Sequence, residues 1–416
     1  MESLKKYFES LAGKDFRCDL EPMRRVCQLF NNPQIQYPTV HIVGTNGKGS
    51  TAAFLESILR EAGLKTGLIT SPHLVDLTER IQTNRKSINS KALNALVEKV
   101  RPQLPEENFL SFFEMITLLG FLYFSEQKVD IAVVEAGMGG RLDATNLLKP
   151  KLILVTPISL DHQNYLGETF TQIAVEKCAV FKPGATVLSS PQKPEIASVI
   201  EASCQKMGLT LKWAHPEAMT HPLGLHGQHQ KINATLALCA AQEILPQAKL
   251  DSVLTKALLK AKWPGRLQYI QKNPPVLIDG AHNLAGIQAL ADYLKEAHSK
   301  AKIHFLLGVL KDKNWEKMFE PLVPLATSFS CVTPVSKRAL PAKELAEHLR
   351  TFGKPTTVLD DWNDLITLSL TLSPRGRGKG EGANCRCEQV LLVATGSLYM
   401  IGELLQYVST NTTETA

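Results

Sequence analysis

The sequence predicts an α/β fold with mostly parallel sheets, divided between two domains. From residue 38 onward, short apolar runs alternate with helical patterns, as is typical of parallel strands joined by helices. A chain of 416 residues also exceeds the usual length of one domain. Trp263-Pro-Gly-Arg266 interrupts the pattern, because proline and glycine stop regular structure. We therefore expect one domain over residues 1–264 and a smaller one over residues 265–416.

The predicted strands follow one another at regular intervals along both halves. The first three precede the predicted boundary and indicate a P-loop-type domain with a mostly parallel sheet. The other three follow the boundary and indicate a smaller, Rossmann-like α/β domain. The six apolar runs cover residues 39–43, 129–134, 152–158, 276–278, 303–307 and 390–394.

The composition is that of an ordinary globular protein. Hydrophobic residues make up 44% of the chain and charged residues 21%, so cores can form and general disorder is excluded. The most apolar run, Ile116 to Phe124, is far shorter than the roughly 20 residues that span a bilayer, and the N-terminus lacks an apolar signal segment. The eight cysteines show no zinc-binding spacing, which favours reduced thiols. We therefore expect a cytoplasmic protein that binds no membrane.

Charge favours small anionic substrates over nucleic acid. The net charge is only +6, and part of it lies in one segment, Ser373 to Ala383, where glycine alternates with charged residues. Such a segment cannot bury a core, so we expect a flexible surface insertion over residues 373–387. An RNA-binding Arg/Gly tract is the alternative, but no aromatic residues are interleaved.

A glycine-rich motif follows the first predicted strand. Gly44-Thr-Asn-Gly-Lys-Gly-Ser50 joins that strand to a predicted amphipathic helix over residues 52–62. Backbone N–H groups, the helix N-terminus and Lys48 supply positive potential for phosphate, and Ser50 or Thr51 can bind Mg²⁺. The motif therefore predicts an ATP-using enzyme. Its spacing departs from the common G-x-x-x-x-G-K-[ST] loop, since only two residues separate Gly44 and Gly47.

Possible metal ligands follow two further strands. Glu135 comes directly after residues 129–134, and Asp161-His162 follows residues 152–158. Open α/β sheets bind ligands beyond the carboxyl ends of their strands. Each signal has a simpler alternative, a helix cap or surface group for Glu135 and a turn for Asp161-His162. The nearby Gly137 to Leu142 stretch fails the G-x-G-x-x-G pattern, so NAD binding is not favoured.

Taken together, the motifs resemble those of the folylpolyglutamate synthase family, which includes dihydrofolate synthases and is related to the Mur ligases. They occur in the family's order over nearly the whole chain, and the unusual loop spacing is also a family feature. The matching stretches are Gly44–Ser50, Ser71–Leu74, Glu79–Ile81, Ser111–Glu114, Glu135–Asn146, Leu160–His162, Glu176-Lys177, His229-Gln230, Asn233-Ala234, Trp263–Arg266, Asp279–Asn283 and Gly396-Ser397.

This resemblance implies an ATP-dependent amide ligase that adds L-glutamate to dihydropteroate, to reduced folates, or to both, through an acyl phosphate. It implies two Mg²⁺ ions, one bound by Ser50, Ser71 and Glu135 and one by Glu135, His162 and a carbamylated Lys177. A solvated surface lysine is the alternative for Lys177. The implied ATP-binding residues are Thr45, Asn46, Gly47, Lys48, Gly49, Ser50, Thr51, Asn233, Arg266 and Asp279.

The resemblance also implies which residues meet the other substrates and perform the chemistry. His282 and Ser397 would bind glutamate, and Lys48, Lys177 and His282 would be catalytic. The implied folate-binding residues are Phe112, Thr117, Arg141, Asp143 and Ala144. Three of the implied binding residues have alternatives: Asn233 could cap a helix over residues 234–241, Arg266 could be a mere linker charge, and Phe112 could be a core residue. Contacts from both domains would complete the site on closure.

Two other functions remain as alternatives. A Mur-type peptide ligase acting on a cell-wall precursor is disfavoured by Ser71–Leu74 and Gly139–Asn146, which are features of folate ligases. A regulatory NTPase is disfavoured because no Asn-Lys-x-Asp element for guanine is present. We expect a monomer whose partners are these small molecules, and no nucleic acid.

Overall fold

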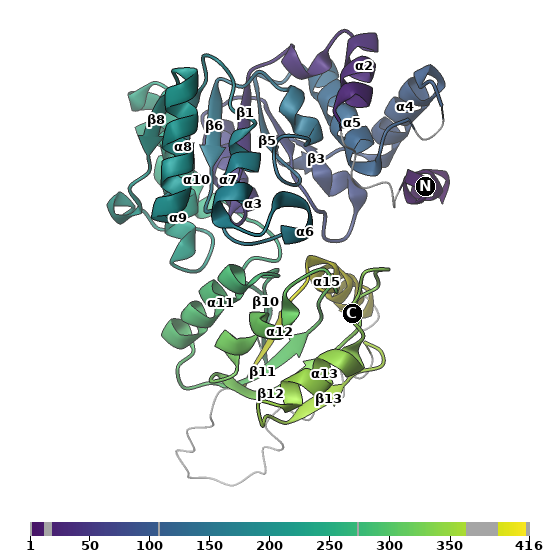
Figure 1. The fold of residues 1–416 in the computed structure, drawn as a ribbon, viewed down its shortest axis with the longest axis vertical. Helices are drawn as coiled ribbons and strands as arrows, with labels where there is room; N and C mark the ends of the chain where they lie inside the picture. The colour runs from purple at the N-terminus through teal and green to yellow at the C-terminus, as the bar shows by residue number, and fades with distance from the viewer. Residues whose placement is uncertain (1, 12–18, 107–108, 273, 363–389, 413–416) are drawn as a thin grey trace. The chain divides into compact units, whose positions relative to one another are not determined.

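The chain forms two α/β units, which confirms the predicted fold class (Figure 1). The computed structural model describes residues 2–11, 19–106, 109–272, 274–362 and 390–412. The first unit comprises Met1–Gly224 and His229–Trp263, and the second comprises Leu225–Gln228 and Pro264–Ala416. Each unit is built on one sheet.

The sheet of the first unit has eight strands in the order β4-β3-β2-β5-β1-β6-β7-β8. All neighbours from β2 to β8 are parallel, and the short β3 and β4 form an antiparallel edge. The central β1 lies between β5 and β6, and all five of its residues are buried. The strands are β1 (Thr39–Val43), β2 (Thr66–Ile69), β3 (Ile81–Thr83), β4 (Lys86–Ser87), β5 (Ile131–Glu135), β6 (Leu152–Val155), β7 (Thr186–Ser189) and β8 (Thr210–Trp213).

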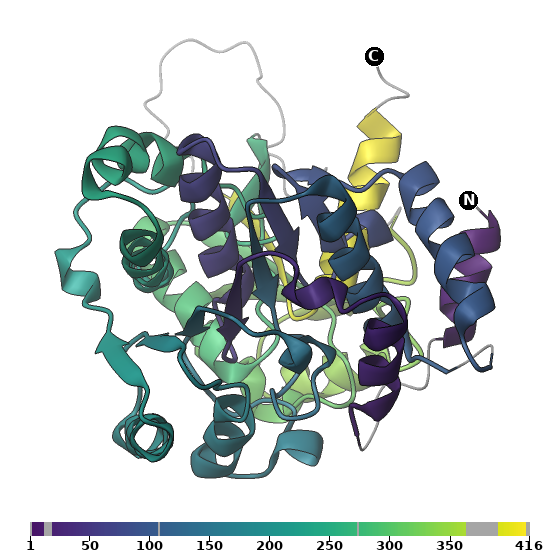
Figure 2. The same cartoon turned by 90° about the horizontal axis from the view of Figure 1, so that it is seen from above.

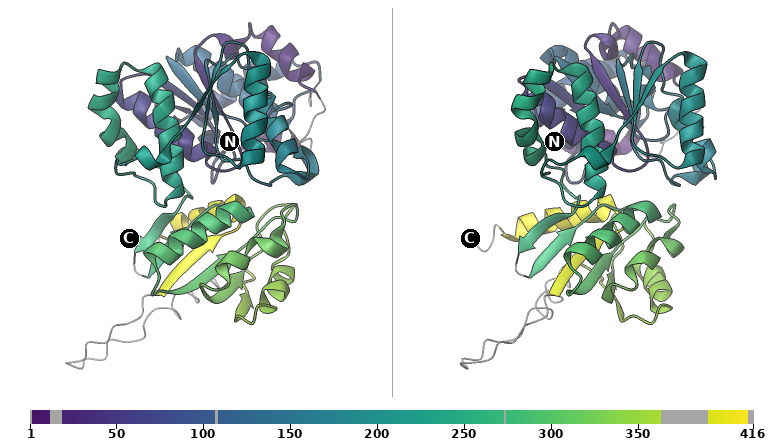
Figure 3. Two further views of the ribbon diagram at one scale, coloured as in Figure 1. Left: turned by 60° about the vertical axis from the view of Figure 1, so that its left-hand side comes forward. Right: turned by 90° about the vertical axis from the view of Figure 1, so that its left-hand side faces the viewer.

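Helices cover both faces of this sheet (Figure 3). On one face α3 packs against α9 and α10, and on the other α7 and α8 pack on the sheet through one apolar cluster. Near the N-terminus, α1 lies beside α4 (Figure 2). The helices are α1 (Glu2–Leu11), α2 (Glu21–Leu29), α3 (Lys48–Glu61), α4 (Ser90–Val100), α5 (Phe112–Gln127), α6 (Gln163–Leu166), α7 (Phe170–Cys178), α8 (Pro194–Met207), α9 (His229–Ile244) and α10 (Gln247–Lys260).

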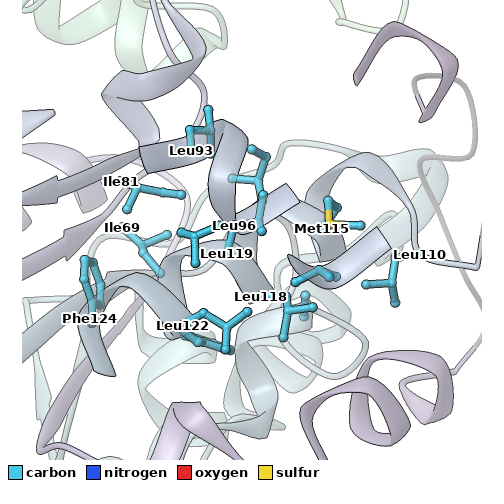
Figure 4. Close-up of a cluster of buried hydrophobic side chains, with 14 of the residues drawn as sticks. Ile69, Ile81, Leu93, Leu96, Leu110, Met115, Leu118, Leu119, Leu122 and Phe124 are labelled. Carbon is cyan, nitrogen blue, oxygen red and sulfur yellow. The ribbon is translucent and has the colours of Figure 1, made fainter. Parts of the chain in front are cut away.

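The apolar run from Ile116 to Phe124 lies inside α5, which packs in a protein core. Its leucines and Phe124 meet Ile69 of β2, Ile81 of β3 and Leu93 of α4 (Figure 4). A helix that is apolar all round is expected where other elements surround it. None of the described helices is long and apolar enough to span a membrane.

The sheet of the second unit has six strands in the order β13-β12-β11-β14-β10-β9. Its strands are parallel except β9, which pairs antiparallel with β10. The apolar residues of these strands and of α11 and α13 form a separate core. The elements are β9 (Gln268–Lys272), β10 (Pro275–Ile278), β11 (Lys302–Leu307), β12 (Ala326–Cys331), β13 (Thr356–Val358), β14 (Val390–Thr395), α11 (Leu284–Ala297), α12 (Trp315–Met318), α13 (Ala342–Arg350) and α15 (Leu398–Thr412).

A short segment, Leu225–Gln228, belongs to the second unit although the chain on both sides of it belongs to the first. The ring of His226 lies edge-on to Tyr269, with 5.9 Å between ring centroids, and 6.3 Å from Tyr293. Gln228 Nε2 donates a hydrogen bond of 3.0 Å to Glu296 of α11. The chain therefore passes between the two units three times.

The predicted elements exist, but several boundaries differ. Helix α3 begins at Lys48, four residues earlier than predicted, because Gly47 already caps it. Strand β5 begins at Ile131, two residues late, since Val129 still bonds to Phe124 in the turn that ends α5. Strand β6 ends at Val155, three residues early, and Pro157 just beyond it has no N–H for a ladder.

The predictions of a surface insertion and of reduced cysteines both involve residues outside the described ranges. The insertion over residues 373–387 lies entirely outside them. Five of the eight cysteines are described, and all five carry free thiols, as the sequence predicted.

Candidate functional site

The glycine-rich loop begins directly after β1 and is fixed by the neighbouring strand end. The backbone N–H groups of Thr45 and Asn46 both donate to the carbonyl of Pro157, at 3.0 and 3.1 Å. The Asn46 amide donates to Ser159 Oγ at 3.0 Å, and Thr45 Oγ1 donates to the Ser159 carbonyl at 3.1 Å. The segment after β6 therefore holds the loop from one side.

Two glycines let other side chains approach the loop closely. Gly47 has a φ of +88°, a left-handed conformation that favours glycine, and a Cβ there would overlap Asn233 Oδ1. A Cβ on Gly49 would lie 2.6 Å from the indole Nε1 of Trp263. The loop and the start of α3 are thus packed against α9 and against the last residue of the first unit.

The alternative role of Asn233 as a helix cap is wrong. Helix α9 begins at His229, so Asn233 lies in its second turn, not at its N-terminus. The Asn233 amide donates to Gln230 Oε1 at 2.9 Å, and Gln230 Nε2 lies 3.4 Å from Ser50 Oγ. Both side chains are buried against the loop.

Glu135 is the last residue of β5 and is buried, so its alternative as a surface group is wrong. Its carboxylate lies 3.9 Å from Lys48 Nζ, and it accepts a hydrogen bond of 3.2 Å from the Ser71 backbone N–H. Lys48 also donates to the Thr45 carbonyl at 3.2 Å. The end of β5 and the segments that follow β1 and β2 therefore meet at the carboxyl edge of the sheet, where parallel sheets bind ligands.

Lys177 is also buried, which excludes its alternative as a solvated surface lysine. Its Nζ donates to the Gly44 carbonyl at 2.8 Å. Burial, together with the charge of Lys48, lowers the pKa of Lys177 to about 7, and Asp161 and Asp143 oppose the shift. A lysine in this environment has a large neutral fraction near pH 7.

His162 lies in a turn and caps the four-residue α6 in a left-handed conformation, with a φ of +52°. The backbone N–H of His162 donates to Asp161 Oδ1 at 2.9 Å, and its ring Nε2 lies 3.9 Å from Asp161 Oδ2. The turn that the sequence allowed is therefore present. It places a buried carboxylate and a half-buried imidazole beyond the end of β6.

The donors around the loop fit a hard divalent cation better than zinc. No group of three or more His, Cys, Asp or Glu residues that could hold a metal lies within the described part of the chain. The loop region instead offers one buried carboxylate, Glu135, and the buried hydroxyl of Ser50. Mg²⁺ prefers such oxygen ligands and binds through few protein groups when phosphate oxygens and water complete its shell.

The loop between β5 and β6 is closed by the buried Asp143. Its Oδ2 accepts from the Met138 N–H at 2.9 Å, and its Oδ1 accepts from the N–H and the hydroxyl of Thr145, at 3.0 and 2.5 Å. Burial raises the pKa of Asp143, and the hydrogen bonds from Thr145 and Met138 act against that rise. Asp143 therefore fixes the shape of the segment Gly137–Asn146.

The other predicted folate residues surround this loop in different environments. Arg141 is exposed and forms an ion pair of 2.9 Å with Glu176. Ala144 and Thr117 are buried, and Thr117 Oγ1 has no hydrogen-bond partner among the described residues. Phe112 is half-buried, packs against the apolar core of α5, and has the Arg80 guanidinium 5.1 Å from its ring centre. Phe112 therefore packs partly in the core, as the alternative proposed, and remains partly exposed.

In the second unit, the predicted residues follow β10 and β14. Asp279 is buried and accepts from the backbone N–H groups of Leu267 and Ala281, at 2.8 and 2.9 Å. Arg266 approaches Gly280 so closely that a Cβ there would overlap its guanidinium.

His282 and Ser397 lie on neighbouring loops of this unit. The His282 Nδ1 is 2.8 Å from the Gly280 carbonyl and donates to it. Ser397 Oγ accepts from the Tyr399 N–H at 3.2 Å, and the preceding Gly396 donates to the Ala281 carbonyl. The carboxyl ends of β10 and β14 therefore form one local cluster of polar groups.

Sequence reasoning missed several residues of these clusters. Gln230 and Trp263 stand in stretches that carried the family resemblance, so that signal was available. Thr145 also stands in such a stretch, whereas Ser159 and His41 gave no signal, because their roles depend on side chains that approach from other elements. Of these, His41 is completely buried on β1.

Two family models match the chain. The model described as the Mur ligase middle domain matches residues 42–190, and the model described as the Mur ligase, glutamate ligase domain matches residues 265–377. The first match contains the glycine-rich loop, and the second begins at Gly265, within the Trp263–Arg266 stretch that interrupts the chain pattern.

Curated relatives match over almost the whole length. The dihydrofolate synthase/folylpolyglutamate synthase of Bacillus subtilis is 32% identical, covering 92% of this chain and 93% of the relative. The folylpolyglutamate synthase of Lacticaseibacillus casei is 31% identical, with the same two coverages. The dihydrofolate synthetase of Saccharomyces cerevisiae is 28% identical and covers 93% and 97%.

Solved structures share the fold. Mycobacterium tuberculosis folylpolyglutamate synthase, complexed with ADP and AMPPCP, is 29% identical with a TM-score of 0.83, covering 94% of this chain and 95% of that one. Escherichia coli FolC, in complex with DHPP and ADP, is 26% identical with a TM-score of 0.86, covering 99% and 98%.

The close packing of Gly49 on Trp263 predicts a specific mutational effect. In Gly49→Ala the new methyl group would lie 2.6 Å from the indole nitrogen, so the ring or the first turn of α3 must shift. We expect the free energy of unfolding to fall by about 1–3 kcal/mol in urea denaturation. Measured in a Trp263→Leu background, the same substitution should cost less than half as much. An equal cost in both backgrounds would contradict the packing argument.

The burial of His41 predicts a pH-dependent stability. Burial lowers the pKa of His41 from 6.5 to about 3, so the unfolded chain takes up a proton below pH 6.5 while the folded chain does not. Stability is therefore lost as the pH falls through 6.5. Between pH 7 and pH 5 the wild type should lose about 2 kcal/mol more than His41→Gln in urea denaturation. The control is His215→Asn, which changes an exposed histidine. This variant should lose as much stability between pH 7 and pH 5 as the wild type does.

Proposed function

Because this chain belongs to the folylpolyglutamate synthase/dihydrofolate synthase family of the Mur ligase superfamily, we propose that its acceptor is dihydropteroate, a reduced folate, or both. The enzyme is an ATP-dependent ligase that joins L-glutamate to a folate-type acceptor through a carbon–nitrogen bond. The observation that carries the proposal is the glycine-rich loop with Lys48 and the buried Glu135 at the carboxyl edge of the sheet.

The chemistry requires an activated carboxylate. A carboxylate resists attack by an amine, so the γ-phosphoryl group of ATP is first transferred to it, and ADP leaves. The glutamate amine then attacks the acyl carbon, phosphate leaves, and the amine loses a proton. The transferred phosphoryl group carries negative charge, which Lys48 and the N–H groups at the start of α3 are placed to stabilise.

The nucleotide is bound in this proposal by the loop and by residues that contact it. Asn233 belongs to this set because its side chain touches Gly47, and Gln230 joins it because of its approach to Ser50. From the second unit, Arg266 and Asp279 are proposed on the family resemblance. The other members from the first unit, proposed on the family resemblance, are Thr45, Asn46, Gly47, Lys48, Gly49, Ser50 and Thr51.

Two Mg²⁺ ions complete the proposed site, and when bound they neutralise phosphate oxygens. Ser50, Ser71 and Glu135 would hold one ion, supported by the hydrogen bond that joins Ser71 to Glu135. Glu135, His162 and a carbamylated Lys177 would hold the other. A neutral lysine amine adds carbon dioxide and loses one proton, and the burial of Lys177 favours that neutral form.

The acceptor and glutamate are assigned to different units. The E. coli relative in complex with DHPP and ADP supports a folate-type ligand, and we propose that it lies against the Gly137–Asn146 loop. Its residues would be Phe112, Thr117, Arg141, Asp143 and Ala144. Glutamate would be bound by His282 and Ser397. The relatives give no support to a Mur-type peptide ligase or a regulatory NTPase.

The ligase assignment predicts which mixtures produce ADP. With dihydropteroate, and separately with tetrahydrofolate, we expect ADP to form at a high rate only when L-glutamate is also present. Equal ADP formation without an acceptor would instead indicate an NTPase. A response to tetrahydrofolate but not to dihydropteroate would restrict the enzyme to the later glutamate additions.

The proposed carbamate predicts the behaviour of a Lys177 variant. Lys177→Ala should keep its circular dichroism spectrum but lose about ten- to a hundredfold in kcat, the range seen when a group that orients a metal ligand is removed. With ¹³C-bicarbonate, the wild type should show a carbamate carbon signal that the variant lacks. The control is Lys206→Ala, which changes an exposed lysine on α8. Near-normal turnover in Lys177→Ala would refute the role.

A further inference from the structure

The first unit contains a series of buried hydrogen bonds that ends at Asp143, a proposed acceptor contact, and includes two residues to which no substrate contact is assigned. It starts at His41 on the central strand β1, whose Nε2 lies 2.7 Å from Thr145 Oγ1. The Thr145 hydroxyl lies in turn 2.5 Å from Asp143 Oδ1. His41 and Thr145 are completely buried, and Asp143 is 5% exposed. The series therefore runs from the middle of the sheet to the Gly137–Asn146 loop without reaching solvent.

The direction of these bonds follows from the number of protons available. Asp143 already accepts from the Met138 and Thr145 N–H groups, which suits a carboxylate. The single hydroxyl proton of Thr145 is then donated to Asp143. The Thr145 oxygen must accept from His41, so His41 carries its proton on Nε2.

The other ring nitrogen fits this assignment. Nδ1 of His41 is buried and has no hydrogen-bond partner among the described residues. Burial without a hydrogen-bond partner costs less free energy for a ring nitrogen that carries no proton than for an N–H group. His41 is thus a neutral donor with one fixed tautomer.

The loop that this series holds touches two elements of the site. A Cβ on Gly137 would lie 2.5 Å from the Phe113 ring at the start of α5. A Cβ on Gly140 would lie 2.5 Å from the carbonyl of Glu176, beside Lys177 on α7. A shift of the loop would therefore move its surface relative to both helices. The series from His41 ties the middle of this loop to the central strand β1 through side chains.

We propose that His41 and Thr145 are positioning residues that set the affinity for the acceptor, by fixing Asp143 and the Gly137–Asn146 loop without contacting the substrate. The inference rests on the proposed function, in which this loop binds a folate-type acceptor. Hydrogen bonds in series polarise one another, so the loss of either donor weakens the whole series. The ATP-binding loop has its own supports at Pro157 and Ser159, so we expect its affinity for ATP to change much less than the affinity for the acceptor.

The kinetic test compares Thr145→Val, which removes the hydroxyl, with Thr145→Ser, which retains it. We expect Thr145→Val to raise KM for the acceptor about tenfold, the usual size for one hydrogen bond to a charged group, and to change KM for ATP less than twofold. Thr145→Ser should restore the acceptor KM to within twofold of the wild type. His41→Phe should raise the acceptor KM about as much as Thr145→Val does. The double variant should have an acceptor KM no higher than that of the single variant with the higher KM.

The matched control is Thr66→Val on β2. The Thr66 hydroxyl is also buried and donates to a carboxylate, Glu56 Oε1, at 2.8 Å, but it lies outside the series. This variant should lose stability without raising the acceptor KM. A rise of both KM values in Thr145→Val, or an equal rise of the acceptor KM in Thr66→Val, would show a merely structural role and overturn the proposal.

A second measurement does not depend on turnover. In a ¹⁵N-histidine spectrum, with His41 identified by its loss in His41→Phe, we expect the neutral Nε2–H tautomer from pH 6 to pH 8. An Nδ1–H tautomer or a charged ring would overturn the assignment. If the wild type formed no additional ADP with any folate-type acceptor, the proposed function would be refuted, and this spectrum would still test the hydrogen bonds of the series. If the wild type were active and Thr145→Val kept its acceptor KM, the inference alone would fail.

Discussion

The site depends on the burial of two ionisable groups, Glu135 and Lys177, beside the glycine-rich loop. Removing a charge from water costs several kcal/mol unless the protein replaces the lost solvent. The cost of burying Glu135 is offset by the hydrogen bond from the Ser71 N–H and by the charge of Lys48. The cost of burying Lys177 is reduced by its hydrogen bond to the Gly44 carbonyl and by its lowered pKa, which favours the neutral amine. Because each partner comes from a different segment, satisfying these groups also fixes the segments relative to one another.

Much of this arrangement could be read from the sequence, because it follows from local patterns. Strand β1 has the predicted bounds, and a glycine-rich turn and a helix follow it in the predicted order, although Lys48 and Ser50 lie in the helix and not in the turn. The carboxyl-edge rule likewise placed Glu135 near the loop. What could not be read are contacts between distant segments. Neither the burial of Lys177 nor the approach of Asn233 to Gly47 has a local signature.

The same limit explains the errors at element ends. Helix α3 starts before its amphipathic pattern does, because Gly47 can cap it and the residues that follow serve the loop. The cap assigned to Asn233 was plausible from composition, yet α9 extends back to His229 and leaves Asn233 free to face the loop. His41 was hidden for another reason, since a histidine in a strand of otherwise apolar residues gives no indication of its partner.

Because Leu225–Gln228 belongs to the second unit, the second unit cannot be expressed completely as one contiguous fragment. A gene fragment that encodes residues 264–416 alone would omit His226 and Gln228, which pack on Tyr269, Tyr293 and Glu296. The fragment would expose an aromatic surface that the intact chain covers. The two units are therefore separable as compact bodies but not as contiguous pieces of sequence, so recombining domains between relatives needs exchange points at both Gly224 and Trp263.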